Sequence, residues 1–129
     1  MSWDAEFFTA DELRCQCGCG EAAMHPAFMQ QLDKLRRDFD QPLTVSSGYR
    51  CPTHNDNVSS TGRYGPHTTG KAVDLRISGT DAVHLLHLAT AQGFAGIGIA
   101  QRGNHAARFI HVDTLENAPR QPRPWIWSY

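Results

Sequence analysis

Apolar residues recur at helical spacing over residues 26–39, and this pattern predicts an amphipathic helix packed on a core. Charged residues occupy the opposite face of the same segment. The apolar face consists of Phe28, Met29, Leu32, Leu35 and Phe39. Pro26 suits the first helical turn, where a backbone N–H is not needed, and Pro42 follows the end of the segment.

A second helix is expected over about residues 80–92. Thr80 is a candidate N-cap, and Gly93 is a typical stop signal. We expect its buried face to be made by Val83, Leu86 and Ala89, with Leu85 and Leu88 flanking it.

Alternation of apolar and polar residues predicts strands. The segment 72–77 places Val73, Leu75 and Ile77 on one face and Ala72, Asp74 and Arg76 on the other. This alternation is typical of a half-buried strand. Further strands are expected at 43–46, 97–100 and 109–113, and in the last of these His111 and Asp113 point away from Ile110 and Val112.

These elements predict one small α+β domain. The domain covers residues 1–129, with 1–25 as a cysteine-containing N-terminal extension and 26–129 as the core. If the apolar faces of the strands pack against the helices, Asp74 and His111 lie together on the exposed face of the sheet. The turn-rich segment 51–69 predicts a long functional loop without a packed element. The aromatic tail, 119–129, is expected to be extended, either covering a sheet edge or lining a substrate groove.

Composition narrows the classes of function. The formal net charge is -1, so no broad electrostatic attraction to nucleic acid is expected. No apolar run approaches the length of a membrane span, and the N-terminus shows no secretory signal, so we expect a product made in the cytoplasm. A monomer is expected.

Four cysteines leave three interpretations open. Cys15, Cys17 and Cys19 alternate within one short run, and Cys51 lies further along the chain. They could form a structural metal site, with His54 as a further candidate, or a disulfide if the protein works outside the cytoplasm. They could also be unreactive thiols, because spacing alone does not settle connectivity.

Two imidazoles and a carboxylate are the strongest chemical signal in the chain. His67 precedes Asp74 by seven residues, and His111 lies in the last predicted strand. Three protein ligands leave a fourth metal position for a water molecule, whose pKa zinc lowers from about 15.7 towards about 7. The alternative is that His67 is a loop histidine and that Asp74 belongs to a turn or a salt bridge.

Three ordered motifs resemble the M15 family of zinc D-Ala-D-Ala peptidases, in particular its short bacterial and bacteriophage members. They are Ser46-Ser47-Gly48-Tyr49-Arg50, the run His67-x-x-Gly70-x-Ala72-x-Asp74, and Phe109-Ile110-His111-Val112-Asp113. The resemblance implies a fold of the Hedgehog and D-Ala-D-Ala-peptidase type, a small antiparallel sheet flanked by helices. It also implies zinc ligation by His67, Asp74 and His111, and substrate binding by Arg50.

Two positions depart from the family pattern. Gly65 stands where relatives commonly carry a serine, two residues before the first metal histidine. No glutamate or histidine lies a few residues before His111, where many relatives place a general base. His105, six residues upstream, is the nearby side chain with a suitable pKa, and we expect it either to fold back as the base or to be a loop histidine.

The sequence therefore predicts a zinc metallopeptidase that hydrolyses peptide bonds next to a D-amino acid in bacterial peptidoglycan. Its class would be a carboxypeptidase or an endopeptidase, such as a bacteriophage endolysin. Asp113 could orient a ligand imidazole or cap the end of its strand. The alternative functions are a non-catalytic zinc-binding module that binds cell wall or a partner protein and, more weakly, a thiol-based role centred on Cys15.

Overall fold

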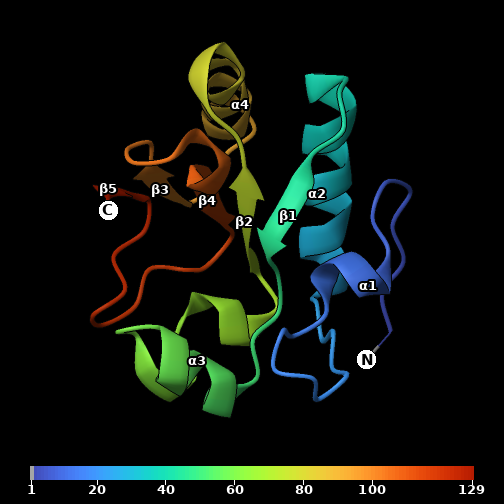
Figure 1. The fold of residues 1–129 in the computed structure, drawn as a ribbon, viewed down its shortest axis with the longest axis vertical. Coiled ribbons are helices and arrows are strands. Elements are labelled where there is room, and N and C mark those ends of the chain that lie inside the picture. The colour runs from blue at the N-terminus through green and yellow to red at the C-terminus, as the bar shows by residue number, and fades with distance from the viewer. Residues whose placement is uncertain (1) are drawn as a thin grey trace.

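A five-stranded sheet organises the computed structural model, which describes residues 2–129. In spatial order the strands are β1 (Thr44–Ser47), β2 (Ala72–Arg76), β4 (Phe109–Asp113), β3 (Gly96–Ala100) and β5 (Trp125–Ser128). The first three pairings are antiparallel, and β5 runs parallel to β3. The predicted α+β class with a mainly antiparallel sheet is confirmed, and Figure 1 shows the arrangement.

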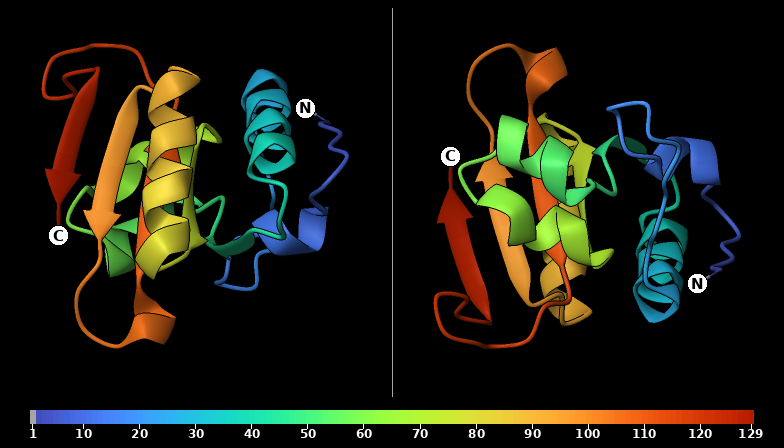
Figure 2. Two further views of the ribbon diagram at one scale, coloured as in Figure 1. Left: turned by 90° about the horizontal axis from the view of Figure 1, so that it is seen from above. Right: turned by 90° about the horizontal axis from the view of Figure 1, so that it is seen from below.

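Helices cover both faces of this sheet. In Figure 2, α4 (Gly79–Ala91) lies in front of the sheet when it is seen from above, and α3 (Pro52–Val58) lies in front when it is seen from below. The helix α2 (Pro26–Phe39) packs beside α4, with the bounds that its apolar pattern predicts. The core fills the face covered by α2 and α4. It contains Val73, Leu75, Ile97, Ile110 and Val112 from the strands.

The N-terminal segment contributes to the same core. After the short helix α1 (Ala10–Leu13), the chain turns and returns along the sheet edge, with the Leu13 and Met24 side chains at most 1% exposed. The Tyr49 N–H donates to the Leu13 carbonyl at 2.9 Å, and the His25 N–H donates to the Gly70 carbonyl at 2.9 Å. These bonds fasten the extension to the segments that carry the predicted site residues.

The prediction of an unpacked loop between Cys51 and Thr69 is wrong. This segment contains α3 and two 3₁₀ turns, η1 (Gly62–Tyr64) and η2 (Pro66–Thr69). Pro52 occupies the first helical position of α3, and the completely buried Asn55 joins α3 to the following turn by donating to Thr61 Oγ1 at 2.9 Å. The turn-forming composition thus supports short helical elements held by a buried amide.

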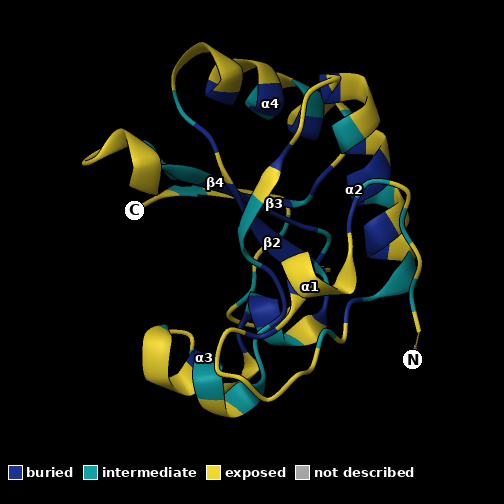
Figure 3. Ribbon diagram, turned by 45° about the vertical axis from the view of Figure 1, so that its right-hand side comes forward, coloured by how far each residue is buried: buried dark blue, intermediate teal, exposed yellow. Residues whose placement is uncertain are grey.

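These elements also bury the face of the sheet that was expected to be exposed. Ala72 is completely buried, and Asp74 is 5% exposed. Figure 3 shows β2 as buried, with exposed residues on the outer surfaces of α3 and α4. The strand is therefore buried on both faces, except at Arg76.

The predicted buried face of α4 is rotated from the observed one. Ala82, Leu85 and Ala89 are buried, whereas Val83 is 69% exposed. The helix begins at Gly79, one residue earlier than predicted, and Ser78 stands at the N-cap position in place of the predicted Thr80. Because leucines and other apolar residues occur all round this helix, periodicity alone left several faces possible.

No helix in the range 2–129 combines the length and apolar character needed to cross a membrane.

Paired substitutions test the observed face of α4. Leu85→Ala should lower the free energy of unfolding by about 2–5 kcal/mol, because it opens a cavity in the core. Val83→Ala should change it by no more than about 0.5 kcal/mol, because that side chain is exposed. Urea denaturation of both variants measures the difference, and equal losses would mean that the helix is rotated relative to this structure.

Candidate metal centre

The candidate metal centre lies on one row of paired residues that crosses four neighbouring strands of the sheet. Asp74 on β2 is paired with His111 on β4, His111 with Gly98 on β3, and Gly98 with Trp127 on β5. Residues paired across neighbouring strands project on the same face. His67 reaches the same place from η2, on the layer that covers this face.

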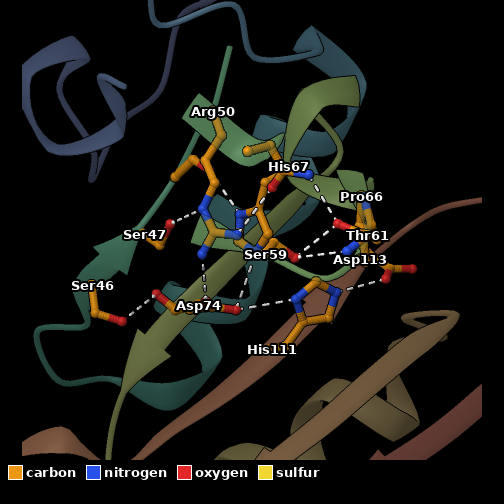
Figure 4. Close-up of polar contacts among 12 residues, drawn as sticks. Ser46, Ser47, Arg50, Ser59, Thr61, Pro66, His67, Asp74, His111 and Asp113 are labelled. Atoms are coloured by element: carbon orange, nitrogen blue, oxygen red, sulfur yellow. Dashed lines mark hydrogen bonds and ion pairs between the residues drawn. The ribbon is translucent and has the colours of Figure 1, made fainter. Parts of the chain in front are cut away.

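The three predicted ligands meet in a buried cluster. His67, Asp74 and His111 each offer a ligand atom within 4.8 Å of the other two. They are 5%, 5% and 2% exposed, so the expectation of an exposed sheet face is corrected here. Figure 4 shows the Asp74 carboxylate between the two imidazoles.

Each imidazole uses one nitrogen as a donor and turns the other towards Asp74. His67 Nδ1 lies 2.8 Å from the Gly48 carbonyl, and His111 Nε2 lies 2.7 Å from the Asp113 carboxylate. Both partners only accept hydrogen bonds, so these nitrogens carry the protons. In the neutral rings, the lone pairs of His67 Nε2 and His111 Nδ1 then face Asp74 Oδ1 at 3.3 and 3.1 Å.

Three acceptors facing one another in a buried place require a positive charge among them. Either the imidazoles carry an additional proton or a metal cation binds there. Ligands about 2.0–2.1 Å from a tetrahedral zinc ion lie roughly 3.3 Å from one another, which agrees with the two separations from Asp74 Oδ1. The donor set and its spacing therefore fit a metal ion.

In this cluster the negative charge of Asp74 and the positive charge of a protonated His111 stabilise each other. Burial opposes ionisation of Asp74, but when the imidazoles carry the additional proton, the hydrogen bonds and charges of His111 and His67 outweigh burial and hold the pKa of Asp74 well below its ordinary value. Burial also opposes protonation of His111, yet its bonds to Asp113 and Asp74 raise its pKa. The site thus keeps a carboxylate ionised and attracts a cation.

Asp113 both orients the His111 ring and caps the end of β4. It is completely buried, and its Oδ1 also accepts from the Leu115 N–H at 3.3 Å. Arg123 donates to both of its oxygens, from Nε at 3.0 Å and from Nη2 at 2.9 Å. Burial raises the pKa of Asp113, but the bonds from His111 and Arg123 lower it further than burial raises it.

Two glycines make room for this arrangement. A Cβ atom on Gly96 would collide with the Asp113 carboxylate, and one on Gly98 would lie 2.7 Å from Trp127 Nε1. Because Gly98 has no side chain, the Trp127 ring reaches across it and packs 5.0 Å from the His111 ring. The sequence analysis did not identify Arg123. It expected the aromatic residues of the tail, which include Trp127, to cover a sheet edge or line a groove, but not to pack on a ligand histidine. The pairing of β5 with β3 brings Trp127 to that place.

Arg50 is held at the rim of the cluster. Its Nε donates to Ser47 Oγ at 3.1 Å, and its Nη1 donates to Asn55 Oδ1 at 3.1 Å. Its Nη2 lies 3.7 Å from Asp74 Oδ2. Asn55 was also missed by the sequence analysis, although it joins Arg50 to the turn that follows α3.

The departure at Gly65 has a steric reason. A Cβ atom there would lie 2.6 Å from Thr61 Cβ and 2.8 Å from Asn55 Nδ2. The Gly65 carbonyl accepts from the Thr68 hydroxyl at 2.7 Å. A larger residue at this position would therefore displace Asn55 and, through it, Arg50.

A cavity of about 810 Å³ opens above the three ligands. Aromatic residues make much of its wall: Tyr64, Phe109, Trp125, Trp127 and Tyr129. Arg50, Arg120 and Arg123 also line it. The tail therefore both extends the sheet edge and lines this cavity, the two roles that the sequence left open.

The structure does not bring His105 to this cavity. His105 is exposed and begins η3 (His105–Ala107), before β4. It lines a different hollow with Arg76 and Asp81. The Arg108 N–H bonds to the His105 carbonyl and closes a tight turn, so the chain does not fold His105 back towards His111.

A second group of metal-ligating side chains lies outside the cavity. The Sγ atoms of Cys15, Cys17, Cys19 and Cys51 lie within 4.8 Å of one another. All four cysteines are free thiols, so the alternative of a disulfide is not observed. His54 contributes its backbone N–H, which donates to Cys51 Sγ at 3.4 Å.

The sequence profile of the family described as Peptidase M15 matches residues 6–113. This range includes the three metal-ligand candidates and ends at Asp113, before Arg123 and Trp127. No curated protein matches the chain.

Arg123 should support the centre through Asp113. Arg123→Ala leaves the buried Asp113 carboxylate without its paired donors, and we expect the affinity of the His67, Asp74 and His111 site for zinc to fall about 10–100-fold. Arg120→Ala is the matched control, since Arg120 lines the same cavity and is exposed. Competition with a chromophoric chelator, in a background in which Cys17 and Cys19 are serine, measures the affinity. Equal affinities in the two variants would remove Arg123 from this role.

Proposed function

The chain belongs to the peptidase M15 family, and we propose on this premise that it is a zinc peptidase that cleaves bacterial peptidoglycan peptides next to a D-amino acid. The observation that carries the proposal is the buried set of His67, Asp74 and His111 at the base of an open cavity. Three protein ligands are typical of a catalytic zinc site, which keeps one coordination position open. Two imidazoles with one carboxylate favour zinc over magnesium or calcium, which prefer oxygen ligands.

Zinc bound there would supply Lewis-acid polarisation of the scissile carbonyl and activation of a water molecule. The protein's own groups prepare the site for it. Gly48 and Asp113 fix the orientation of the two imidazoles, so both metal-facing nitrogens are unprotonated when the rings are neutral. The Trp127 ring covers one side of His111 and keeps water from that side.

Arg50 is the group best placed to bind an anionic part of the substrate. Its Nε and Nη1 are engaged by Ser47 and Asn55, which fix the plane of the guanidinium. Its side chain is 18% exposed and lines the cavity, so donors remain available there. They can bind a terminal carboxylate or stabilise the negative oxygen that develops as the peptide carbonyl is attacked.

The charge of the cavity supports a peptide that carries carboxylates. Three arginines line it, and Asp74 is the one acidic residue among the lining residues of the described chain, 2–129. Peptidoglycan stem peptides carry free carboxylates next to D-residues, so their charge complements this lining. The aromatic wall offers apolar surface to the short side chains of such peptides.

One observation favours a second function, a non-catalytic zinc module that binds cell wall or a partner protein. Within residues 2–129, the lining of the cavity includes no carboxylate or imidazole other than the three ligand candidates. A separate carboxylate or imidazole base is therefore not part of the described cavity lining, and His105 lies elsewhere.

Digestion of purified peptidoglycan peptides, followed by mass spectrometry, separates the two functions. The zinc-loaded protein should release a defined fragment, whose mass identifies the bond. The chelated protein and the Asp74→Ala variant should release none. A protein that holds zinc at this site, binds the peptides and leaves them intact would instead support the binding module.

Arg50→Ala should retain the metal and lose turnover. Removal of a donor that stabilises the developing oxyanion costs roughly 10²–10³-fold in kcat. Arg50→Lys keeps a charge without the planar guanidinium, and we expect it to recover only part of the rate. Metal stoichiometry and steady-state kinetics on the same preparations provide the check. An unchanged rate for Arg50→Ala would exclude Arg50 from the reaction.

A further inference from the structure

We propose that Cys15, Cys17, Cys19 and Cys51 bind a second metal ion, of the zinc class, which clamps the N-terminal segment to residues 48–51. Cys15 follows α1, Cys17 and Cys19 lie in the turn over residues 16–19, and Cys51 precedes α3. The sulfurs thus come from two parts of the chain separated by more than 30 residues. The proposal does not depend on peptidase activity.

The distances between the sulfurs fit ligands of one tetrahedral ion. Cys15 Sγ lies 3.5 Å from Cys17 Sγ, which lies 3.7 Å from Cys51 Sγ. Thiolates about 2.3 Å from a zinc ion lie about 3.8 Å from one another. A donor set made only of sulfur also differs from the nitrogen and oxygen set of the first centre, and it favours soft metals.

The local backbone is organised around these sulfurs. The Cys51 N–H donates to Cys15 Sγ at 3.3 Å, and the His54 N–H donates to Cys51 Sγ at 3.4 Å. Such bonds stabilise the negative charge of a thiolate. Gly18 and Gly20 have φ angles of 91° and 82°, which only glycine adopts easily, and they let the turn bring Cys17 and Cys19 back beside Cys15.

The clamp lies directly beside the first centre. Gly48 accepts from His67, and the Arg50 N–H donates to the His67 carbonyl at 3.1 Å. The Tyr49 N–H, in the same segment, donates to the Leu13 carbonyl and so joins this segment to the N-terminal part of the chain. A metal that joins Cys15 to Cys51 would fix the segment at its end, and so restrain the positions of Gly48 and Arg50.

The positive charge of the bound metal ion is balanced by the release of thiol protons. Each coordinating thiol loses its proton to the buffer, so up to four protons leave when one metal ion binds. No oxidant or reductant takes part. The cysteines remain reduced, as the free thiols in the structure are.

Metal counting on reduced, zinc-loaded and desalted protein tests the proposal. The unmodified chain should hold two zinc ions. Cys17→Ser and Cys19→Ser should each hold one, and because both side chains are exposed these variants should remain folded. Gln16→Ser is the matched control in the same turn and should hold two. His111→Ala should hold the cysteine-bound ion alone. A folded wild-type chain with one zinc ion, lost in His111→Ala and kept in Cys19→Ser, would overturn the proposal.

Two further readouts separate ligation from a general loss of structure. Cobalt-loaded wild type and His111→Ala should show a thiolate-to-cobalt charge-transfer band that Cys19→Ser lacks. Cys19→His, which restores a ligand, should regain the second zinc ion. Two bound cobalt ions without any charge-transfer band would exclude thiolate ligation.

Hydrogen exchange tests the clamp itself. In His111→Ala, zinc should slow exchange of the Tyr49 amide by roughly 100-fold at a free concentration of about 100 times Kd, if exchange requires opening of the clamp. The same zinc added to the double variant His111→Ala with Cys19→Ser should leave this amide unchanged. Equal exchange in the two variants would show that bound metal does not clamp the segment.

Discussion

The structure depends on three buried acceptors that face one another, His67 Nε2, Asp74 Oδ1 and His111 Nδ1. Their partners on the far side, the Gly48 carbonyl and Asp113, fix which nitrogen carries the proton. A neutral, metal-free arrangement would leave lone pairs opposed in a place that water hardly reaches. The surrounding structure supports this constraint: Arg123 neutralises Asp113, and Gly96 and Gly98 leave room for the Asp113 carboxylate and the Trp127 ring.

The same constraint explains how so small a domain can hold a candidate metal centre. Two ligands lie on central, hydrogen-bonded strands, which hold them more rigidly than loops would. The third comes from η2, whose position depends on the layer formed by α3 and the N-terminal segment. The proposed cysteine-bound metal would act on this less regular half of the site. Membership of the peptidase M15 family implies a peptidase, and the arginine-lined cavity supports the proposal that it acts on anionic peptides.

The sequence predicted the parts of the fold in which one periodicity dominates. The helix over 26–39 and the strand over 109–113 have the predicted bounds. Asp74 and His111 share a face because both strands alternate. His67 was a candidate from its spacing to Asp74, which the family motifs supported, and Arg50 came from the family motifs. The buried face of α4 was predicted wrongly because apolar residues occur all round that helix. The prediction of a loop over 51–69 was wrong because the buried amide of Asn55 organises that segment. The contacts of Arg123 with Asp113 and of Trp127 with His111 were missed because the parallel pairing of β5 with β3 has no local signature. His105 was a candidate base because an imidazole can transfer protons near neutral pH, but the tight turn closed by the Arg108 N–H keeps it away from His111.

Anomalous diffraction at the zinc absorption edge, from crystals of the zinc-loaded protein, tests the central claim most directly. The account predicts a peak within bonding distance of His67 Nε2, the Asp74 carboxylate and His111 Nδ1. The peak should be absent from crystals of Asp74→Ala grown under the same conditions. Zinc-containing crystals of the unmodified chain with no peak between these three side chains would contradict the account.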